Sequence, residues 1–232
     1  MSSITPTQVT RRSQLYRRHS ELGAEFEENN GLILVKAYGS ETELAQAKEL
    51  GLADLSTLPR TGFKGAGAPD WVAAQGVTLP RQPNTCAVQS DAGLVAKLSY
   101  QELLVLSDLN ATSSMIEKLN QCSVGEQTYA LPRADSHCWL AVTGSQAAEM
   151  FSKICAVDLR AHKFANAEVA QTSVAKANSI VIRHDLGSTQ CFYILTDVSA
   201  TEFLWDCLLD AMEEHQGVTI GVAAIRSLAA VE

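Results

Sequence analysis

The sequence predicts an α+β fold made of two copies of one unit that pack on a common core. Two segments are nearly the same: residues 103–112 read LLVLSDLNAT, and residues 192–201 read FYILTDVSAT. Each is typical of an apolar strand, a polar turn and the start of a helix. A weaker echo relates residues 65–79 to residues 144–159. Such copies must stack to bury their apolar faces, and the crevice between them is the natural place for a ligand.

Composition excludes several classes of protein. The chain has 232 residues, of which 46% are hydrophobic and 19% charged, as in a folded globular protein. A net charge of −8 argues against a nucleic-acid binder, whose affinity rests on Lys and Arg. No run is apolar enough to cross a membrane, and residues 1–10 are too polar for a signal peptide. We therefore expect a cytoplasmic protein with neither nucleic-acid nor membrane partners.

The cysteines and histidines predict no metal site. The six cysteines are scattered without a C-x-x-C pair, which favours reduced, buried thiols over a zinc or redox motif. The five histidines are also dispersed. His184 is expected at the point where a strand over residues 179–183 turns into a loop.

The first half of the chain is expected to span residues 13–127, after a flexible N-terminal arm of residues 1–12. The glycines of residues 62–67 lack the spacing of a phosphate-binding loop, and we interpret them as a turn from strand to helix. A helix should begin near Pro69, a residue favoured in the first turn. The predicted strands are 32–35, 86–90, 93–100 and 103–106, and the predicted helices are 42–50, 69–76 and a third carrying Met115, Ile116 and Leu119.

The second half is expected over residues 128–232 and to form one globular unit with the first. Its last helix should open with Ser199 and Glu202, which have the spacing of a capping box. Trp205 lies off the apolar stripe of that helix, so it belongs either to a broader core or to an interface. The stripe itself consists of Phe203, Cys207, Leu208 and Met212. The other predicted elements are strands 137–142, 170–175, 179–183 and 192–195 and a helix over 145–154.

A basic cluster lies near the N-terminus. It has two interpretations: a solvated surface, or a docking patch for an acidic partner. Its members are Arg11, Arg12, Arg17, Arg18 and His19.

Several short motifs resemble known proteins. Residues 159–164 (LRAHKF), 170–175 (AQTSVA), 180–183 (IVIR) and 199–206 (SATEFLWD) are similar to the gamma subunit of heterotetrameric sarcosine oxidase. This resemblance extends over residues 138–216.

The front of the chain resembles the broader aminomethyltransferase (glycine-cleavage T-protein) folate-binding superfamily. The matching residues are Leu15-Tyr16 with His19 and Gly23, followed by residues 50–56 (LGLADLS). The resemblance implies two duplicated ferredoxin-like halves packed around a central cavity, which binds folate in the catalytic relatives.

The resemblance also implies that catalytic groups are missing. In aminomethyltransferases a Gly-Gly-x-x-Asp-Asp turn supplies the carboxylate that positions the folate nitrogen, whereas residues 92–97 read AGLVAK, with alanine or lysine instead. A cation there cannot accept the proton or steer the amine. A second folate motif, Gly-Glu-x-Gly-Phe-Glu, matches residues 187–193 (GSTQCFY), and its carboxylates are absent.

These losses predict an accessory gamma-type subunit without catalytic residues. It would belong to a multi-subunit, flavin-dependent, sarcosine oxidase-like amine oxidoreductase. The resemblance places FAD or FMN, NAD and tetrahydrofolate in larger partner subunits and no cofactor in this chain. We expect it to pack on the partner's folate domain through Arg17, Arg18 and an exposed face near Trp205.

The alternative is a stand-alone tetrahydrofolate-dependent aminomethyltransferase-like enzyme or a folate-binding protein with a rebuilt or vestigial pocket. Asp91, Lys97 and Tyr100 are its candidate residues. A lysine in a partly dry cavity can have a lowered pKa and act as a base, whereas a lysine pointing into solvent cannot. Binding of tetrahydrofolate would discriminate between the two classes.

Overall fold

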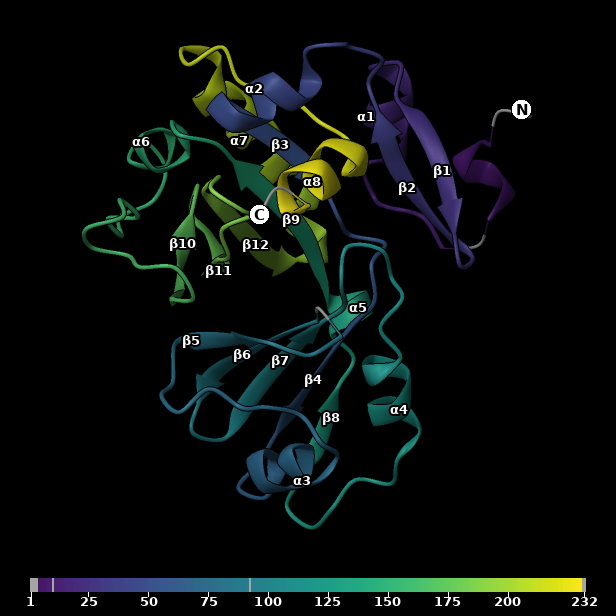
Figure 1. The fold of residues 1–232 in the computed structure, drawn as a ribbon, viewed down its shortest axis with the longest axis vertical. Coiled ribbons are helices and arrows are strands. Elements are labelled where there is room, and N and C mark those ends of the chain that lie inside the picture. The colour runs from purple at the N-terminus through teal and green to yellow at the C-terminus, as the bar shows by residue number, and fades with distance from the viewer. Residues whose placement is uncertain (1–3, 10, 92, 231–232) are drawn as a thin grey trace.

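The computed structural model describes residues 4–9, 11–91 and 93–230. Helices and strands are distributed along the whole of this part of the chain (Figure 1). In chain order the elements are η1 (Pro6–Gln8), α1 (Tyr16–Glu21), β1 (Glu25–Asn29), β2 (Leu32–Ala37), α2 (Glu43–Leu50), β3 (Gly51–Asp54), β4 (Arg60–Lys64), α3 (Ala68–Ala74), β5 (Thr85–Val88), β6 (Leu94–Ser99), β7 (Glu102–Leu106), α4 (Met115–Gln121), β8 (Tyr129–Leu131), α5 (Arg133–Ser136), β9 (His137–Thr143), α6 (Ala147–Phe151), β10 (Val169–Val174), β11 (Ala177–Arg183), β12 (Cys191–Asp197), η2 (Val198–Ala200), α7 (Thr201–Glu213), β13 (Val218–Thr219) and α8 (Val222–Ala229).

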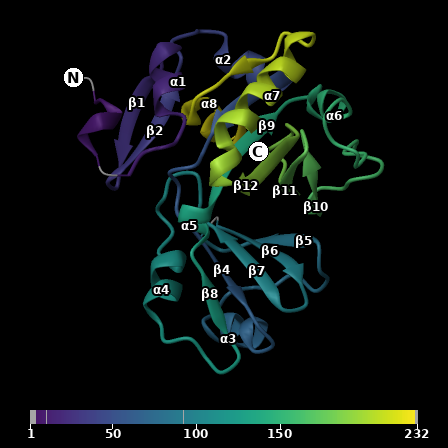
Figure 2. The same cartoon turned by 180° about the vertical axis from the view of Figure 1, so that it is seen from behind.

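The strands form two large sheets and one hairpin. One sheet has six strands in the order β10-β11-β12-β9-β3-β13, and the other has five in the order β5-β6-β7-β4-β8. The hairpin of β1 and β2 lies beside α8, on the flank of the six-stranded sheet, in both views of the molecule (Figures 1 and 2). The predicted α+β fold class is confirmed.

The internal duplication is visible in the topology. The series β4-α3-β5-β6-β7-α4 in one sheet corresponds to β9-α6-β10-β11-β12-α7 in the other, and the strand orders β5-β6-β7-β4 and β10-β11-β12-β9 match. The two repeated sequence segments provide β7 and β12, which take equivalent places in their sheets. In both copies an aspartate at the end of this segment's strand, Asp108 just after β7 or Asp197 as the last residue of β12, accepts hydrogen bonds from the backbone of the next turn.

The residues before β4 do not follow the duplication. β3 pairs with β9 and β13, so this part of the predicted first half belongs to the sheet of the second. The division at residues 127 and 128 stays a prediction, as does the flexibility of residues 1–12. Residues 1–3 and 10 of that arm lie outside the described residues. Nearby, Pro6 is buried and Arg11 Nη2 donates to the carbonyl of Ala134 at 3.1 Å.

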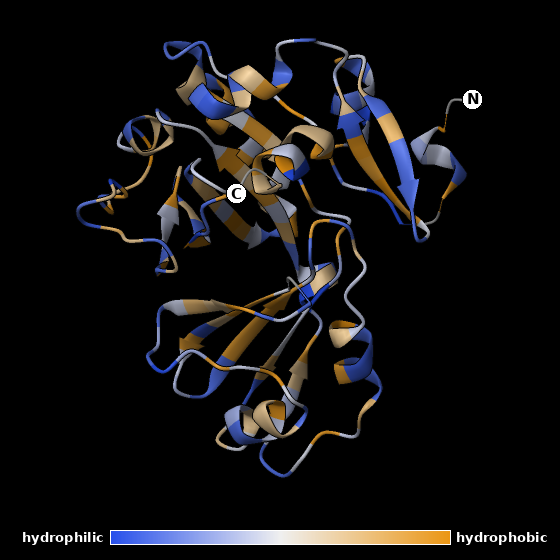
Figure 3. Cartoon of the chain, in the orientation of Figure 1, coloured by the Kyte–Doolittle hydropathy of each residue, from blue (hydrophilic) through white to orange (hydrophobic). Residues whose placement is uncertain are grey.

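Three apolar cores hold the layers together, and the strands carry most of their side chains (Figure 3). The first lies between the two large sheets and continues under α8. The second lies between the six-stranded sheet and helices α6 and α7. The third lies between the five-stranded sheet and helices α3 and α4. Each large sheet is therefore covered on both faces.

The last long helix differs from its prediction in its start and its buried face. It begins at Thr201 without a side-chain cap, after the 3-10 turn η2, so the predicted capping box is wrong. Ser199 instead donates its hydroxyl to Asp197 at 2.5 Å. Phe203 is 54% exposed and Trp205 only 1% exposed, so the helix turns Trp205 inward. Its buried residues are Thr201, Leu204, Trp205, Leu208, Ala211 and Met212.

Candidate functional site

Strand β6 forms one wall of the space between the two sheets. Because side chains alternate along a strand, Leu94, Ala96 and Leu98 face this space, whereas Val95 and Lys97 face the opposite side. The core assignments agree: the first set packs in the inter-sheet core, and Val95 packs with α3 and α4. Ala96 is 0% exposed. The resemblance left open whether alanine or lysine replaces the missing carboxylate. Of these two residues, Ala96 is the one whose side chain faces the space between the sheets.

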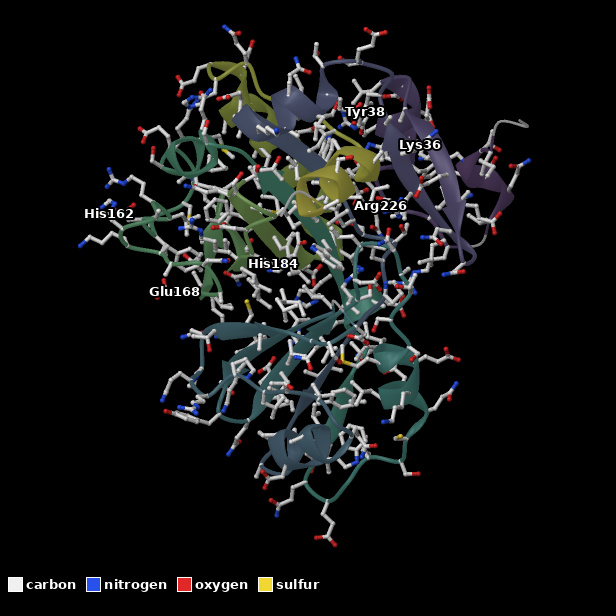
Figure 4. All side chains as sticks on the ribbon, viewed as in Figure 1. Lys36, Tyr38, His162, Glu168, His184 and Arg226 are labelled. Carbon is white, nitrogen blue, oxygen red and sulfur yellow. The ribbon has the colours of Figure 1, made fainter. Side chains whose placement is uncertain are left out.

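The opposite wall comes from β9 and β12. Trp139 and Tyr193 meet edge to face there, with ring centroids 5.2 Å apart. Burial raises the pKa of Tyr193 well above its usual value, and the pKa of Cys191 rises for the same reason. His184, next to the five-stranded sheet in Figure 4, lies 5.6 Å from the Tyr193 ring. Burial lowers the pKa of His184, and the nearby charge of Asp185 opposes this effect only in part.

Among the residues that the structure describes, neither segment that matches a folate motif brings a carboxylate into this space. Apolar side chains from both sheets meet in one core there. Ala96 brings no carboxylate, and Cys191 and Tyr193 of the second matching motif bring a thiol and a phenol. Ala92, the first residue of the AGLVAK stretch, lies outside the described residues.

The three candidate pocket residues are spread along the surface of the five-stranded sheet. Lys97 Nζ donates to the carbonyl of Arg81 at 3.3 Å and lies 5.6 Å from the centre of the Tyr100 ring. Tyr100 is 69% exposed. Asp91, at the other end of β6, accepts from the Ser113 hydroxyl at 2.6 Å. Of the two positions considered for Lys97, in a cavity or pointing into solvent, the structure has it outside the inter-sheet core, because its side of β6 faces away from that core.

The predicted interface residues lie around one buried contact. Trp205 packs against the ring of His19, with centroids 5.1 Å apart, so the Trp205 ring itself is buried, and an interface on the exposed face near it stays a prediction. Arg17 and Arg18 are exposed on α1. Arg18 Nη2 is paired with Asp206 Oδ2 on α7 at 2.9 Å.

Sequence reasoning missed a buried polar cluster around His19. His19 Nε2 lies 2.9 Å from Asp54 Oδ2, and His19 Nδ1 lies 2.8 Å from the Tyr38 hydroxyl. Asp54 also accepts from the Ser13 hydroxyl and from the Ser56 amide. His19 and Asp54 both belong to segments that resemble the aminomethyltransferases. This common resemblance is the feature of the sequence from which their proximity could have been predicted.

The hydrogen bonds of the cluster hold the N-terminal segment against the end of β3. Burial alone would raise the pKa of Asp54, but hydrogen bonds and charge from His19, with hydrogen bonds from Ser13 and Ser56, hold it below its usual value. Burial raises the pKa of Tyr38. Ser13 bonds to the aspartate and not to His19, so the arrangement lacks the serine–histidine contact of a hydrolase. The adjoining cavity, about 10 Å³, has room for about one water molecule at most.

A second polar junction joins the two sheets. Buried Arg60 donates to the carbonyls of Ser56 and Leu58 at 2.9 and 2.8 Å and to that of Ala134 at 3.0 Å. Burial lowers the pKa of Arg60 to about 10. On the far edge, the amides of Cys86 and Val169 bridge the sheets through the carbonyls of Ala167 and Asn84.

His137 lies at this junction, beside an open groove of about 360 Å³. Its Nε2 is 3.2 Å from Arg133 Nη1, and its Nδ1 is 2.8 Å from the Ser136 hydroxyl. Burial, together with the charges of Arg133 and Arg60, lowers the pKa of His137 to about 4. The other lining residues are Gln171, Thr172, Asn178, Ser179, Ile180 and Leu195.

The described part of the chain offers neither a metal site nor a membrane span. Among residues 4–9, 11–91 and 93–230, no three His, Cys, Asp or Glu side chains are grouped to hold a metal ion. Over the same residues, every helix is too short or too polar to span a bilayer.

Comparison with known proteins agrees with this geometry. A chain of the heterotetrameric sarcosine oxidase from Corynebacterium sp. U-96, solved in complex with pyrrole 2-carboxylate, aligns with a TM-score of 0.62 and 24% identity. That alignment covers 75% of this chain and 92% of the other. The glycine cleavage system aminomethyltransferase T from Bartonella henselae aligns with a TM-score of 0.70 and 17% identity, over 93% of this chain and 60% of its own.

At these identities the two structures establish the fold. No curated protein sequence matches the chain. The family model described as "GCVT N-terminal domain" matches residues 15–230, nearly the whole sequence. The chain therefore belongs to the GCVT N-terminal domain family.

Proposed function

We propose that this chain is an accessory, non-catalytic gamma-type subunit of a multi-subunit, sarcosine oxidase-like amine oxidoreductase. The observation that carries the proposal is the inward position of Ala96 in an apolar inter-sheet core, at the place where the aminomethyltransferase motif has a carboxylate. A buried methyl group can neither accept a proton nor orient an amine. The likeness over 92% of a chain of a heterotetrameric sarcosine oxidase supports an assembly of several subunits.

In this proposal the chemistry belongs to larger partner chains. Flavin, nicotinamide dinucleotide and tetrahydrofolate would be held there, and this chain would pack on the partner's folate domain in the cytoplasm. The buried clusters around His19 and Arg60 then serve to keep a fixed shape for docking. A rigid surface loses little conformational entropy on binding, which favours a permanent complex.

Purification from the native host tests this proposal. Tagged full-length chain should bring down a large flavoprotein in a fixed molar ratio, with flavin absorbance in the eluate and the partner identified by mass spectrometry. A colourless chain recovered alone contradicts the assignment. The eluate should also oxidise a secondary N-methylated amine, whereas the chain by itself should not.

The alternative of a folate-dependent transferase would need a base supplied from elsewhere in the chain. Family membership and the likeness to aminomethyltransferase T are compatible with it. Lys97, its candidate base, lies on the outer side of β6. Tetrahydrofolate turnover by the chain alone, reduced in Lys97→Ala, would favour this alternative.

A further inference from the structure

An unusual stack of side chains lies on the surface of α1. The guanidinium of Arg12 lies over the Tyr16 ring, 4.6 Å from its centre, and that of Arg17 is 5.3 Å from the same ring. Arg17 Nε also donates to the Tyr16 hydroxyl at 3.0 Å. We call Arg12, Tyr16 and Arg17 the Tyr16 stack. Two cations thus share one aromatic ring at the surface of a chain with a net charge of −8.

The neighbouring arginines are neutralised within the chain, and the stack is not. Arg11 lies 3.8 Å from Asp135, and Arg18 lies 2.9 Å from Asp206. Among the residues that the structure describes, no carboxylate comes within ion-pair distance of Arg12 or Arg17. Both arginines are exposed. The interface was predicted at Arg17 and Arg18. Because Arg18 already forms an ion pair with Asp206, we place the candidate interface at Arg12 and Arg17 instead.

The geometry of the stack suits carboxylates. A guanidinium held against an aromatic face can still offer its two Nη groups to a carboxylate in two parallel hydrogen bonds, although Arg17 already donates its Nε to the Tyr16 hydroxyl. The ring also limits the rotamers of both arginines, which reduces the entropy lost on binding. The two guanidinium groups on one ring repel each other. An anion that binds between them is attracted to both and screens this repulsion.

We infer that the Tyr16 stack docks an acidic segment of a partner protein. This inference rests on the proposed function and names the surface by which the chain would join its complex. An acidic protein segment fits better than nucleic acid, because the overall charge of −8 repels a long polyanion, whereas a few carboxylates can meet a local pair of arginines.

The first experiment uses hexaglutamate as the probe and the full chain. In NMR titrations the Nε–Hε signals of Arg12 and Arg17 should shift and saturate, and the shifts should disappear in high salt. Hexaglutamine is the neutral control. The backbone amide signals around Tyr16 should shift with the same saturation curve. Those amide shifts should be lost in Arg12→Gln/Arg17→Gln and kept in Arg81→Gln/Lys163→Gln, which removes two charges from exposed positions elsewhere. Absence of shifts in the wild type, or tighter binding to single-stranded DNA of matched charge, overturns the inference.

The second experiment uses the complex recovered from the native host. Arg12→Glu/Arg17→Glu should weaken assembly at least about tenfold at low salt, with a smaller effect at high salt. Arg81→Glu/Lys163→Glu, a matched charge reversal, should assemble as the wild type does. Equal assembly by both variants overturns the docking site and leaves the proposed function standing. Recovery of the wild-type chain without a partner overturns the proposed function. In that case the hexaglutamate titration alone tests whether the Tyr16 stack binds carboxylates.

Discussion

His19 and Asp54 form a fully buried pair, with Nε2 2.9 Å from Oδ2, that joins two segments distant in the sequence. His19 ends up under Trp205 of α7, and Asp54 closes strand β3. The pair therefore fastens the N-terminal helix, the hairpin through Tyr38 and the six-stranded sheet at one point. In Figure 4 Tyr38 lies where the hairpin meets α2.

Removal of His19 should destabilise the fold strongly. His19→Ala leaves Asp54 buried with one partner fewer, and breaking a buried pair in this way costs about 3–5 kcal/mol. Urea unfolding of wild type and variant measures the difference. Arg160→Ala is the control, because its pair with Asp158 is exposed and contributes little to stability. A loss in His19→Ala as small as that of the control would contradict the anchoring role.

The register of β6 predicts opposite tolerance at two neighbouring positions. Ala96→Asp places a carboxylate in the inter-sheet core and should cost about 3 kcal/mol or more, even though it restores the residue type of the aminomethyltransferase motif. Lys97→Asp, on the outer face, should stay within about 1 kcal/mol of wild type. Thermal and urea unfolding of the two variants check this. Similar losses at both positions would mean that the assigned facing of β6 is wrong.

His137 should make stability fall as the solution becomes acidic. Its folded-state pKa is about 4, below the value of 6.5 expected in the unfolded chain. Between these values the unfolded chain binds more protons, so the free energy of unfolding decreases as pH falls from about 6.5 to about 4. His137→Gln should flatten the profile in that window, whereas His162→Gln, at an exposed histidine, should not. Unfolding at half-unit pH steps gives the slopes, and identical slopes for all three proteins would count against the prediction.

The two aspartates of the duplication should differ in importance. Asp108 is buried and accepts from the amides of Asn110, Thr112 and Ser113 and from the Thr112 hydroxyl. Asp197 is exposed and accepts hydrogen bonds from the amide and the hydroxyl of Ser199. Asp108→Ala should therefore cost about 2–3 kcal/mol, and Asp197→Ala clearly less. Chemical denaturation of both variants tests this order, and a larger loss in Asp197→Ala would reverse it.

Local patterns were sufficient to predict most elements of the two repeats. The strands over 86–106, the hairpin of β10 and β11 and the helix α2 ending at Gly51 all come from short apolar runs with clear turn residues. β4 was missed because Gly62 and two charged ends hide its apolar residue Phe63. Its strand character comes from pairing with β7 and β8, which are distant in the sequence.

Trp205 shows what local patterns cannot decide. Apolar residues lie on two neighbouring stripes of α7, one through Phe203 and Cys207 and the other through Leu204 and Leu208. A helix turns about 100° per residue, so the two stripes point in different directions. The prediction that buries the stripe of Phe203 therefore leaves Trp205 off the buried face, whereas in the structure Trp205 is buried and Phe203 exposed. The correct stripe is set by His19, which lies far away in the sequence and fills the space beneath Trp205.

The sequence was sufficient to predict that the candidate site lacks a carboxylate. It was not sufficient to predict which side chains face the space between the sheets. Motif comparison identified the missing carboxylate within residues 92–97, but only the pairing of β6 with β5 and β7 distinguishes Ala96 from Lys97. The arginines of the basic cluster were likewise visible in the sequence. Which of them remain unpaired depends on Asp135 and Asp206, from distant segments.

Titration of the full chain with tetrahydrofolate tests the closed inter-sheet core most directly. Trp139 lies in that core, so its fluorescence, isolated in Trp71→Phe/Trp205→Phe, reports on entry of a ligand between the sheets. Isothermal calorimetry of the wild type gives the affinity independently of those substitutions. We predict no saturable heat and no change in Trp139 emission up to about 1 mM tetrahydrofolate, the weak end of specific binding. Saturable binding in the micromolar range, with a shift of Trp139 emission, would contradict the account.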